Sequence, residues 1–597
     1  MCGIFGYVGK RTDASEIVFD GLKTLEYRGY DSWGIAAKTK SSQANSEFIV
    51  EKKTGKIGNS TLPTDLTHSQ LAIGHTRWAT HGGVTVANAH PHLDCYKHIS
   101  VVHNGIIENF QTLKKELVEK GHTFHSETDT EVIPHLIEDV MKNEKKGFAT
   151  AVRDAFNKLQ GMNAIVVAYS PSKEIIAAKT GSPLAVGIGK DEFFISSDAA
   201  GISKYTKNVI FLADNQMVIL GEKLKLLELP KGNEIEPEIT ELTWKFEEST
   251  KGAYPHFFIK EIHEEPRVIK NIALNGVPTA TNLAKLIENA FGTFLIACGS
   301  ASYAAIAATY WFSKIAKKHV NFAVGSEFKY IEDFITPETL IIPISQSGES
   351  IDVIEPTTKA KKEKGAKVAS IVNVLGSTLY RLSDFNFLLE SGPEKAVVAT
   401  KSFTAMIAAI FLTTYTLADR TKEGQDLLML AAENVKNILY DTYLEGIQRV
   451  AKKLNTKEHI YIIGRGVSYA AALEATLKIK EATYIHSEAF PGGELKHGVI
   501  ALIEKGTPCI VFAPNDETYE EIVSNAQEIR ARGGYIIGIG PKNNDVFDDF
   551  LETDDISEAT LLPQITISHL LGYYLSLARG IEDPDKPRNL AKSVTVK

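Results

Sequence analysis

The sequence predicts a multidomain α/β and α+β protein in which a strand-rich domain is followed by two similar domains with parallel sheets. Residues 1–240 contain segments typical of strands and turns, such as 163–170 (NAIVVAYS), and few long helical patterns. From about residue 261, apolar strands alternate with helical segments of roughly 12 or more residues. That alternation indicates parallel sheets covered by helices on both faces.

An internal repeat divides the second half of the chain. The stretch 296–305 (IACGSASYAA) resembles 462–471 (IIGRGVSYAA), and both have a strand before and a helix after the shared SYAA. A charged stretch with Pro230, Gly232 and Pro237 is typical of a connection between domains. We therefore predict a first domain at 1–240, a linker at 241–260, one repeat at 261–450, a second at 451–586 and a C-terminal tail at 587–597.

The composition argues against several classes of function. The net charge is −9 and there is no basic tract, so we expect no nucleic-acid partner. The four cysteines are far apart, which argues against disulfides and against a zinc–cysteine site. The N-terminus has no signal-peptide pattern. The apolar stretch 403–418 is short and contains threonines, so we interpret it as a buried core helix and expect a cytoplasmic protein with no membrane partner.

Cys2 is a candidate nucleophile because it follows Met1. Aminopeptidases remove an initiator Met when a small residue comes next, and the mature chain would then begin with Cys2. A free α-amine has a pKa of roughly 7.7–8.0, so it can take the proton of the thiol on the same residue. Taken alone, Cys2 is equally well interpreted as a small buried hydrophobic residue.

Four further segments change the interpretation of Cys2. They are 28–34 (RGYDSWG), 75–82 (HTRWATHG), 103–109 (HNGIIEN) and 126–131 (SETDTE). With Cys2, in this order and spacing, they resemble the glutaminase domain of the class II, N-terminal-nucleophile amidotransferases over about residues 2–225. The resemblance implies a four-layer αββα fold. Each segment alone has a simpler interpretation, such as a surface ion pair for Arg77 or a tight turn for Asn104 and Gly105.

The resemblance also implies a site for L-glutamine. Cys2 would attack the side-chain amide to form a glutamyl thioester, and Asn104 with the backbone N–H of Gly105 would form the oxyanion hole. Arg77 would bind the α-carboxylate as a fork, and Asp129 would bind the α-ammonium group. Thr80 and His81 would line the pocket, and Trp78 would gate the released ammonia.

Histidines crowd one part of the first domain, which raises the question of a metal. No HExxH motif accompanies them, and strand spacing would place them on both faces of a sheet. We therefore expect no metal site and no organic cofactor. The histidines considered are His75, His81, His90, His92, His98 and His103.

The segment 345–350 (SQSGES) is a candidate phosphate site. It follows an apolar strand and opens a predicted helix, where free backbone N–H groups favour an anion. Simple capping of the helix by Ser345 or Ser347 is the alternative. A helix cap needs only one hydroxyl residue, so phosphate binding better explains the presence of three serines in this segment.

The phosphate segment and the internal repeat resemble the sugar isomerase (SIS) domain family, whose doubly wound α/β members bind phosphosugars. Two SIS domains behind a class II glutaminase domain resemble the amidotransferase family that aminates fructose 6-phosphate. This chain lacks a hydroxyl of the family pattern at Ala301 and at Ala399, and each lost hydrogen bond is worth about 0.5–1.5 kcal/mol. The resemblance places the following residues around the sugar phosphate: Ser300, Ser345, Gln346, Ser347, Ser350 and Val397.

Three charged residues, Glu474, Lys478 and Glu481, have the spacing of one helical face in an apolar segment. Taken alone, they are more typical of a salt-bridge stripe, and His497 is more typical of a solvated loop histidine. The resemblance assigns Glu481 the proton transfer between C1 and C2 of the sugar. It assigns Lys478 a part in proton handling, and it assigns His497 the opening of the sugar ring.

The tail 587–597 (PRNLAKSVTVK) has the composition of a disordered end, but it matches the tail of the same amidotransferase family. In that family the matching lysine forms a Schiff base with the open-chain ketose. The resemblance therefore implies this role for Lys592, with a backbone contact to the sugar from Ala591.

The resemblance as a whole implies conversion of L-glutamine and D-fructose 6-phosphate into L-glutamate and D-glucosamine 6-phosphate, the first step of amino sugar synthesis, by a homodimer or a larger even assembly. One alternative is a class II amidotransferase with an ATP or phosphoribosyl pyrophosphate acceptor, but the loop GxxxxGK[ST] is absent. The other is a non-catalytic sugar-phosphate sensor. The presence of Cys2, Asn104, Gly105 and Lys592 argues against it.

Overall fold

The computed structural model describes residues 2–39, 47–242 and 250–594. The chain forms two compact units, one made of Met1–Ser249 together with Ala591–Lys597, the other of Thr250–Leu590. Residue 1, the stretch 243–249 of the predicted linker and residues 595–597 of the predicted tail lie outside the described residues. The boundaries proposed at 240/241, 260/261, 450/451 and 586/587 stay predictions.

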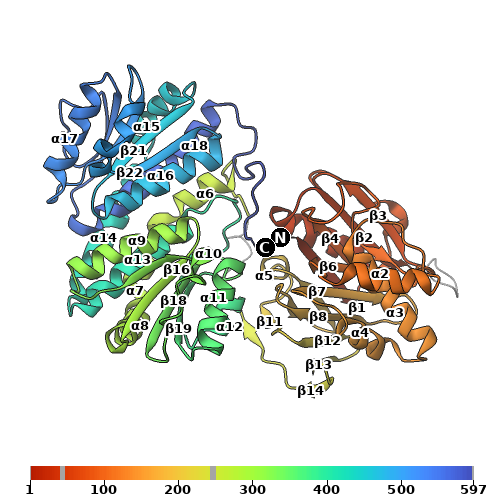
Figure 1. Cartoon of the computed structure of the whole chain (residues 1–597). Coiled ribbons are helices and arrows are strands. Elements are labelled where there is room, and N and C mark those ends of the chain that lie inside the picture. The colour runs from red at the N-terminus through yellow and green to blue at the C-terminus, as the bar shows by residue number, and fades with distance from the viewer. Residues whose placement is uncertain (1, 40–46, 243–249, 595–597) are drawn as a thin grey trace. The chain divides into compact units, whose positions relative to one another are not determined.

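The first unit contains two antiparallel sheets (Figure 1). The eight-stranded sheet has the order β15 (Thr240–Glu241), β11 (Asn208–Phe211), β9 (Ala185–Ile188), β10 (Glu192–Ser196), β1 (Gly3–Gly9), β4 (Ser69–Arg77), β2 (Ser32–Thr39) and β3 (Ile49–Thr54). The seven-stranded sheet has the order β14 (Asn233–Ile235), β13 (Leu224–Glu228), β12 (Gln216–Leu220), β8 (Ile175–Thr180), β7 (Asn163–Tyr169), β6 (Ile99–Gly105) and β5 (His92–Leu93).

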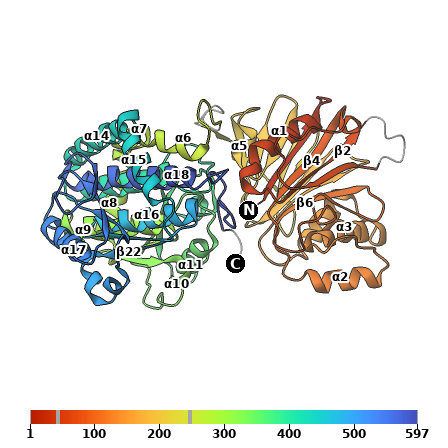
Figure 2. The same cartoon turned by 90° about the horizontal axis from the view of Figure 1, so that it is seen from above.

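Helices cover the outer faces of these two sheets, which gives the predicted αββα layers (Figure 2). Alternation along β1 explains the layering, because Ile4 packs between the sheets whereas Phe5 packs under α1. The eight-stranded sheet is covered by α1 (Ala14–Leu25) and α5 (Ala199–Ile202). The seven-stranded sheet is covered by α2 (Phe110–Glu119), α3 (Val132–Asn143) and α4 (Phe148–Phe156).

The second unit contains two five-stranded parallel sheets with the same strand order. The first runs β17 (Asn321–Val324), β16 (Gly292–Ala297), β18 (Thr339–Ser345), β19 (Lys367–Val372) and β20 (Phe385–Leu388). The second runs β22 (His486–Pro491), β21 (His459–Gly464), β23 (Pro508–Phe512), β24 (Tyr535–Gly540) and β25 (Asp549–Glu552). Each copy of SYAA lies in the helix that follows the first strand of its repeat along the chain. These helices are α9 (Ser300–Lys314), after β16, and α16 (Ser468–Thr483), after β21.

Both parallel sheets have apolar side chains on their two faces. On β16, Leu295 joins the large core that the two sheets share, and Ile296 joins a smaller cluster on the opposite face. The remaining helices of the second unit are α6 (Phe257–His263), α7 (Glu265–Asn275), α8 (Val277–Asn289), α10 (Gly325–Phe328), α11 (Ile351–Lys362), α12 (Thr378–Leu382), α13 (Lys401–Leu417), α14 (Thr421–Ile438), α15 (Asp441–Leu454), α17 (Tyr519–Arg530) and α18 (Leu561–Ala578).

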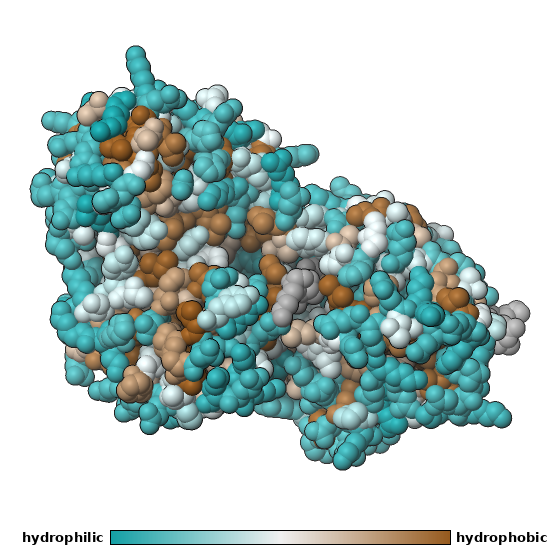
Figure 3. Space-filling model, in the orientation of Figure 1, coloured by the Kyte–Doolittle hydropathy of each residue, from teal (hydrophilic) through white to brown (hydrophobic). Residues whose placement is uncertain are grey.

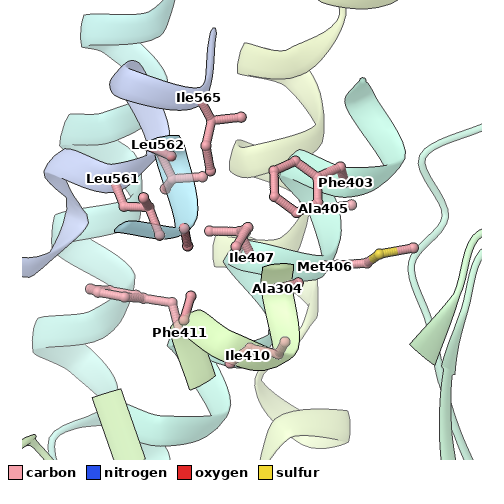
Figure 4. Close-up of a cluster of buried hydrophobic side chains, with 14 of the residues drawn as sticks. Ala304, Phe403, Ala405, Met406, Ile407, Ile410, Phe411, Leu561, Leu562 and Ile565 are labelled. Carbon is pink, nitrogen blue, oxygen red and sulfur yellow. The ribbon is translucent and has the colours of Figure 1, made fainter. Parts of the chain in front are cut away.

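The helix α13 lies in the middle of the shared core, as the apolar stretch 403–418 predicts. Figure 4 shows Phe403, Ile407 and Phe411 among side chains of α9 and α18. Within the described ranges, no helix has the length and hydropathy needed to span a membrane. Hydrophilic residues cover most of the face seen in Figure 3, with smaller hydrophobic patches between them.

Candidate active site

Backbone pairing places Cys2 beside the carboxyl end of β4. It directly precedes β1, whose antiparallel pairing with β4 sets Gly3 opposite Thr76 and so brings Cys2 to Trp78. Cys2 Sγ accepts the N–H of Trp78 at 3.2 Å and lies 3.5 Å from the Trp78 carbonyl oxygen. The residue is partly exposed, so the thiol is accessible to a small molecule.

The carbonyl oxygen of Cys2 accepts three side-chain hydrogen bonds. The donors are Asn104 Nδ2 at 3.0 Å, Arg28 Nε at 3.2 Å and Ser197 Oγ at 3.5 Å. Arg28 is itself buried and pairs with Asp198 Oδ2 at 3.2 Å. The position of Cys2 relative to Asn104, the predicted oxyanion donor, is therefore determined by direct contact.

His75 orients the amide of Asn104. His75 Nε2 lies 3.0 Å from Asn104 Oδ1 and 3.1 Å from the carbonyl oxygen of His103. Both partners are acceptors, so Nε2 carries the hydrogen. Burial lowers the pKa of His75 to about 3, so the ring is neutral at pH 7. This contact directs Asn104 Nδ2 toward Cys2.

Gly105 occupies a position that only glycine fits. Its φ is +136°, and an added Cβ would lie 2.2 Å from the carbonyl oxygen of Met162. Two residues later, the N–H of Ile107 donates to Asp129 Oδ2 at 2.8 Å. The buried Asp129, in the short helix Asp129–Glu131, is thereby placed beside the end of β6 that carries Asn104 and Gly105.

Arg77 contacts a loop of the protein itself. Its Nη1 donates to Gly83 O at 3.2 Å, and its Nη2 donates to Gly82 O at 3.2 Å and to His81 O. Burial lowers the pKa of Arg77, and the nearby Cys2 and Asp129 oppose that shift. The guanidinium of Arg77 thus lies near Cys2 and Asp129. Its role in binding the α-carboxylate of glutamine stays a prediction.

The other residues predicted for the glutamine site lie on the same loop. Trp78 is partly buried and faces the ring of Tyr30, with ring centroids 6.4 Å apart. Thr80 is exposed, and the half-buried His81 packs edge-on against Phe110. The loop is thus close to Cys2 through Trp78, whereas the predicted contacts of Thr80 and His81 with glutamine stay predictions.

In the second unit, the segment 345–350 lies between the end of β18 and the start of α11, as predicted. Ser345 Oγ accepts the N–H of Gly348 at 3.0 Å and lies 3.3 Å from Ser350 Oγ. Ser347 Oγ accepts the N–H of Glu349 at 3.1 Å, and Gln346 is partly exposed. The hydroxyls thus converge on a tight loop at the carboxyl end of a parallel strand, where such folds bind ligands.

A hydroxyl buried beneath this loop was not among the sequence candidates. Gly348 has φ +65°, and a Cβ there would lie 2.0 Å from Ser377 Oγ. Ser377 is buried, and its Oγ has no hydrogen-bond partner among the described residues. The signal that could have found it is its place in the loop after β19, the strand next to β18.

Glu474, Lys478 and Glu481 lie on one face of α16, as their spacing predicts. Lys478 Nζ lies 3.4 Å from Glu474 Oε1 and 2.8 Å from Glu481 Oε2. Lys478 is fully buried, and Glu474 and Glu481 raise its pKa against the effect of burial. Glu481 retains partial exposure, with 20% of its side chain accessible, so it is the member of the set that a substrate can reach.

Ser300 joins the two repeats at this cluster. Its Oγ, at the start of α9, donates to Glu474 Oε1 at 3.1 Å. The same carboxylate oxygen lies 3.2 Å from His569 Nε2, and His569 Nδ1 lies 2.6 Å from Glu265 Oε1. Although burial opposes protonation of the ring, the carboxylates Glu265 and Glu474 raise the pKa of His569 to about 9. The ring is therefore a buried cation at pH 7.

A backbone segment between β20 and α13 contacts the same cluster. Lys478 Nζ donates to the carbonyl oxygen of Ala399 at 3.1 Å. Nearby in the chain, the mostly buried Val397 donates its N–H to Asp585 O at 2.9 Å. The structure thus connects Ser300, Lys478 and Glu481, and it places the Val397 segment beside them through Ala399.

Comparisons with known proteins place the chain. A model of the glutamine amidotransferase domain matches residues 75–204, and a model of the SIS domain matches 286–414 and 453–549. The glutamine–fructose-6-phosphate aminotransferase (isomerizing) of Thermococcus kodakarensis is 40% identical, and that of Methanothermobacter thermautotrophicus is 38% identical, each over 100% of both chains. The chain belongs to the glutamine–fructose-6-phosphate aminotransferase (isomerizing) family.

A solved structure is also similar to part of this family member. The C-terminal domain of glucosamine-fructose-6-phosphate aminotransferase from Francisella tularensis is 32% identical, with a TM-score of 0.49, over 55% of this chain and 98% of that chain.

Three further residues are predicted from the aminotransferase resemblance: His497, Ala591 and Lys592. His497 is exposed at the end of the short helix Gly492–His497. Ala591 and Lys592 group with the first unit, whereas Glu481 belongs to the second. The roles of His497, Ala591 and Lys592 stay predictions.

Proposed function

We propose that the chain transfers the amide nitrogen of L-glutamine to D-fructose 6-phosphate and releases L-glutamate and D-glucosamine 6-phosphate. The observation that carries the proposal is the hydrogen bond from Asn104, in β6, to the carbonyl oxygen of Cys2, just before β1, in a chain whose aminotransferase relatives match over their full length. The sensor alternative does not account for that contact.

In the first half-reaction, Cys2 Sγ attacks the side-chain carbonyl carbon of glutamine. Ammonia leaves with a proton from the thiol, and water then hydrolyses the thioester to glutamate. The negative charge on the former carbonyl oxygen would be stabilised by Asn104 Nδ2, which His75 holds toward Cys2, and by the N–H of Gly105. Asp129 would bind the α-ammonium group and Arg77 the α-carboxylate.

In the second half-reaction, Lys592 Nζ adds to C2 of the open-chain ketose and water leaves. Ammonia that passes through the protein interior then adds to C2 and displaces the Lys592 amine. The sugar is left with an imine, C2=NH. Glu481 then moves a proton from C1 to C2, and the product is the aldose with an amino group at C2. The ion pair with Lys478 would hold the carboxylate of Glu481 in position for that transfer. The ring opening is assigned to His497.

The hydroxyls of Ser345, Ser347 and Ser350 would bind the phosphate group together with the N-terminus of α11. Ser300, Gln346, Val397 and Ala591 would contact the sugar. We further propose that the enzyme is cytoplasmic and works as a homodimer or a larger even assembly.

The test uses the purified chain with glutamine labelled by nitrogen-15 at the amide, with fructose 6-phosphate as acceptor, and reads the products by mass spectrometry. Nitrogen-15 in glucosamine 6-phosphate is the expected result. Labelled free ammonia with no amino sugar would support glutamine hydrolysis by the first domain and would contradict fructose 6-phosphate as the acceptor.

The variant Cys2→Ala separates the two half-reactions. It should release no glutamate from glutamine and should still isomerise fructose 6-phosphate. Glutamate release at the wild-type rate by Cys2→Ala would reject Cys2 as the nucleophile.

A further inference from the structure

Four potential metal ligands converge in the first unit, away from the residues assigned above. They are Cys95, just after β5; His122, in the loop after α2; and His135 and Glu138, on α3. Their ligand atoms all lie within 4.8 Å of one another. The two histidines lie outside the histidine-rich region 75–103.

Five of the six distances between these atoms have the size of tetrahedron edges. His122 Nδ1 lies 3.3 Å from His135 Nδ1 and 3.3 Å from Glu138 Oε2, and His135 Nδ1 lies 3.5 Å from Glu138 Oε2. Cys95 Sγ lies 3.7 Å from His122 Nδ1 and 3.5 Å from His135 Nδ1. Ligands at roughly 2.0–2.3 Å from one zinc ion are separated by roughly 3.3–3.8 Å in a regular tetrahedron.

Hydrogen bonding alone explains this arrangement less well. Glu138 Oε2 already accepts the N–H of Cys95 at 3.1 Å. If both rings also donated to it, two Nδ1–H groups whose nitrogens lie only 3.3 Å apart would approach the same oxygen. A cation between the four atoms accounts for all five distances with the lone pairs pointing inward.

The surroundings fit a divalent cation. The outer ring nitrogens face carboxylates, with His122 Nε2 3.9 Å from Asp139 Oδ1 and His135 Nε2 4.0 Å from Glu131 Oε1. These carboxylates are too distant for hydrogen bonds, but their negative charge favours a hydrogen on Nε2, which leaves Nδ1 free to bind a metal. Lys142 Nζ occupies the other oxygen of Glu138 at 3.0 Å, which leaves Oε2 as a single ligand.

We propose that Cys95, His122, His135 and Glu138 bind one zinc ion in tetrahedral geometry. A thiolate, two neutral imidazoles and one carboxylate are ligand types that zinc takes, and their two negative charges balance the ion. Three ligands are almost buried and Cys95 is exposed, so the ion has a route of entry from solvent. This proposal departs from the expectation of no metal.

The ion would join three segments that are separate in the sequence. The loop after β5, the loop after α2 and the helix α3 would share it, and α3 directly follows the short helix that carries Asp129. The site is therefore structural, and its loss should lower the unfolding temperature of the first unit without removing any group that touches substrate.

The first experiment measures bound metal in the full chain, purified under reducing conditions, loaded with zinc chloride and dialysed, by plasma mass spectrometry. About one zinc per chain is expected, and Cys95→Ser and His135→Gln should each reduce the zinc content roughly ten-fold or more. The matched control is His125→Gln, an exposed histidine three residues from His122, which should keep the ion. No zinc in the wild type, or zinc retained by both ligand variants, would overturn the proposal.

The second measurement does not depend on the folding of variants. Wild-type protein reconstituted with cobalt(II) should show the intense thiolate-to-cobalt charge-transfer absorption of a tetrahedral site, and zinc should displace it. A cobalt spectrum without that absorption would overturn the assignment of Cys95 as a ligand.

Discussion

His569 Nε2 lies 3.2 Å from Glu474 Oε1 inside the second unit, and the opposite nitrogen of the same ring lies 2.6 Å from Glu265 Oε1. Glu265, Glu474 and His569 come from α7, α16 and α18, and all three are fully buried. Glu474 also contacts Lys478, whose partner Glu481 is the proposed proton carrier. The buried cation thus supports the helix that presents Glu481.

The stability of the second unit should depend on pH through His569. The folded pKa is about 9 and the unfolded value is roughly 6.5, so the stabilisation is complete below the unfolded value and is lost as the pH rises through about 9. His569→Gln should cost about 3–5 kcal/mol near pH 6 because two carboxylates lose their partner. The difference from wild type should shrink by pH 10 in denaturant unfolding curves.

The control for this change is His319→Gln, an exposed histidine of the same unit, which should leave the unfolding curve unchanged at every pH. A difference between wild type and His569→Gln that stays constant from pH 6 to pH 10 would argue against a charged His569.

Asn104→Ala should lower kcat for glutamine hydrolysis by about 10²–10³, because one preorganised donor to the oxyanion is lost. KM for glutamine should change little, because the proposed contacts to the α-carboxylate and α-ammonium groups remain. Glutamate release measures the effect, and isomerisation of fructose 6-phosphate by the same sample is the internal control. An unchanged kcat would remove Asn104 from the oxyanion hole.

Glu481→Gln should lower the rate of amino sugar formation by about 10²–10⁴, because the amide does not accept the C1 proton. Glutamine hydrolysis should persist. The matched control is Glu488→Gln, an exposed glutamate on β22, which should retain full activity. Exchange of the C1 proton with deuterium oxide, followed by NMR, measures the step directly, and wild-type exchange in Glu481→Gln would assign the proton transfer to another base.

Lys592→Ala should abolish the covalent adduct that borohydride forms between the protein and fructose 6-phosphate, because the Schiff-base amine is gone. Mass spectrometry of the intact chain detects the adduct. Lys480→Ala, which removes an exposed lysine of α16, should leave the adduct in place. An adduct that persists in Lys592→Ala would move the Schiff base to a different amine.

Local patterns predicted the elements and some of the contacts within them. The period-two strands, the alternation after residue 261 and the helical face of Glu474, Lys478 and Glu481 all follow from spacing along the chain. The structure confirms these features. They could be predicted because each depends on neighbours within a few residues.

The supporting residues could not be predicted in this way. His569 and Glu265 are 304 positions apart, and α18 is apolar on all sides, so no periodicity marks its histidine. His75 contacts Asn104 because β4 and β6 belong to sheets that stack face to face, and sequence spacing does not encode that stacking. Pairings of this kind depend on tertiary packing, which only the three-dimensional structure provides.

The shared core around α13 determines which fragments of the second unit can fold. Side chains from both parallel sheets and from α9, α13 and α18 pack into one apolar cluster. A fragment carrying only the second sheet would leave α18 without its α13 partner, exposing a wide apolar surface, and would leave His569 without Glu265. The two repeats therefore behave as one cooperative folding unit, and soluble fragments require both.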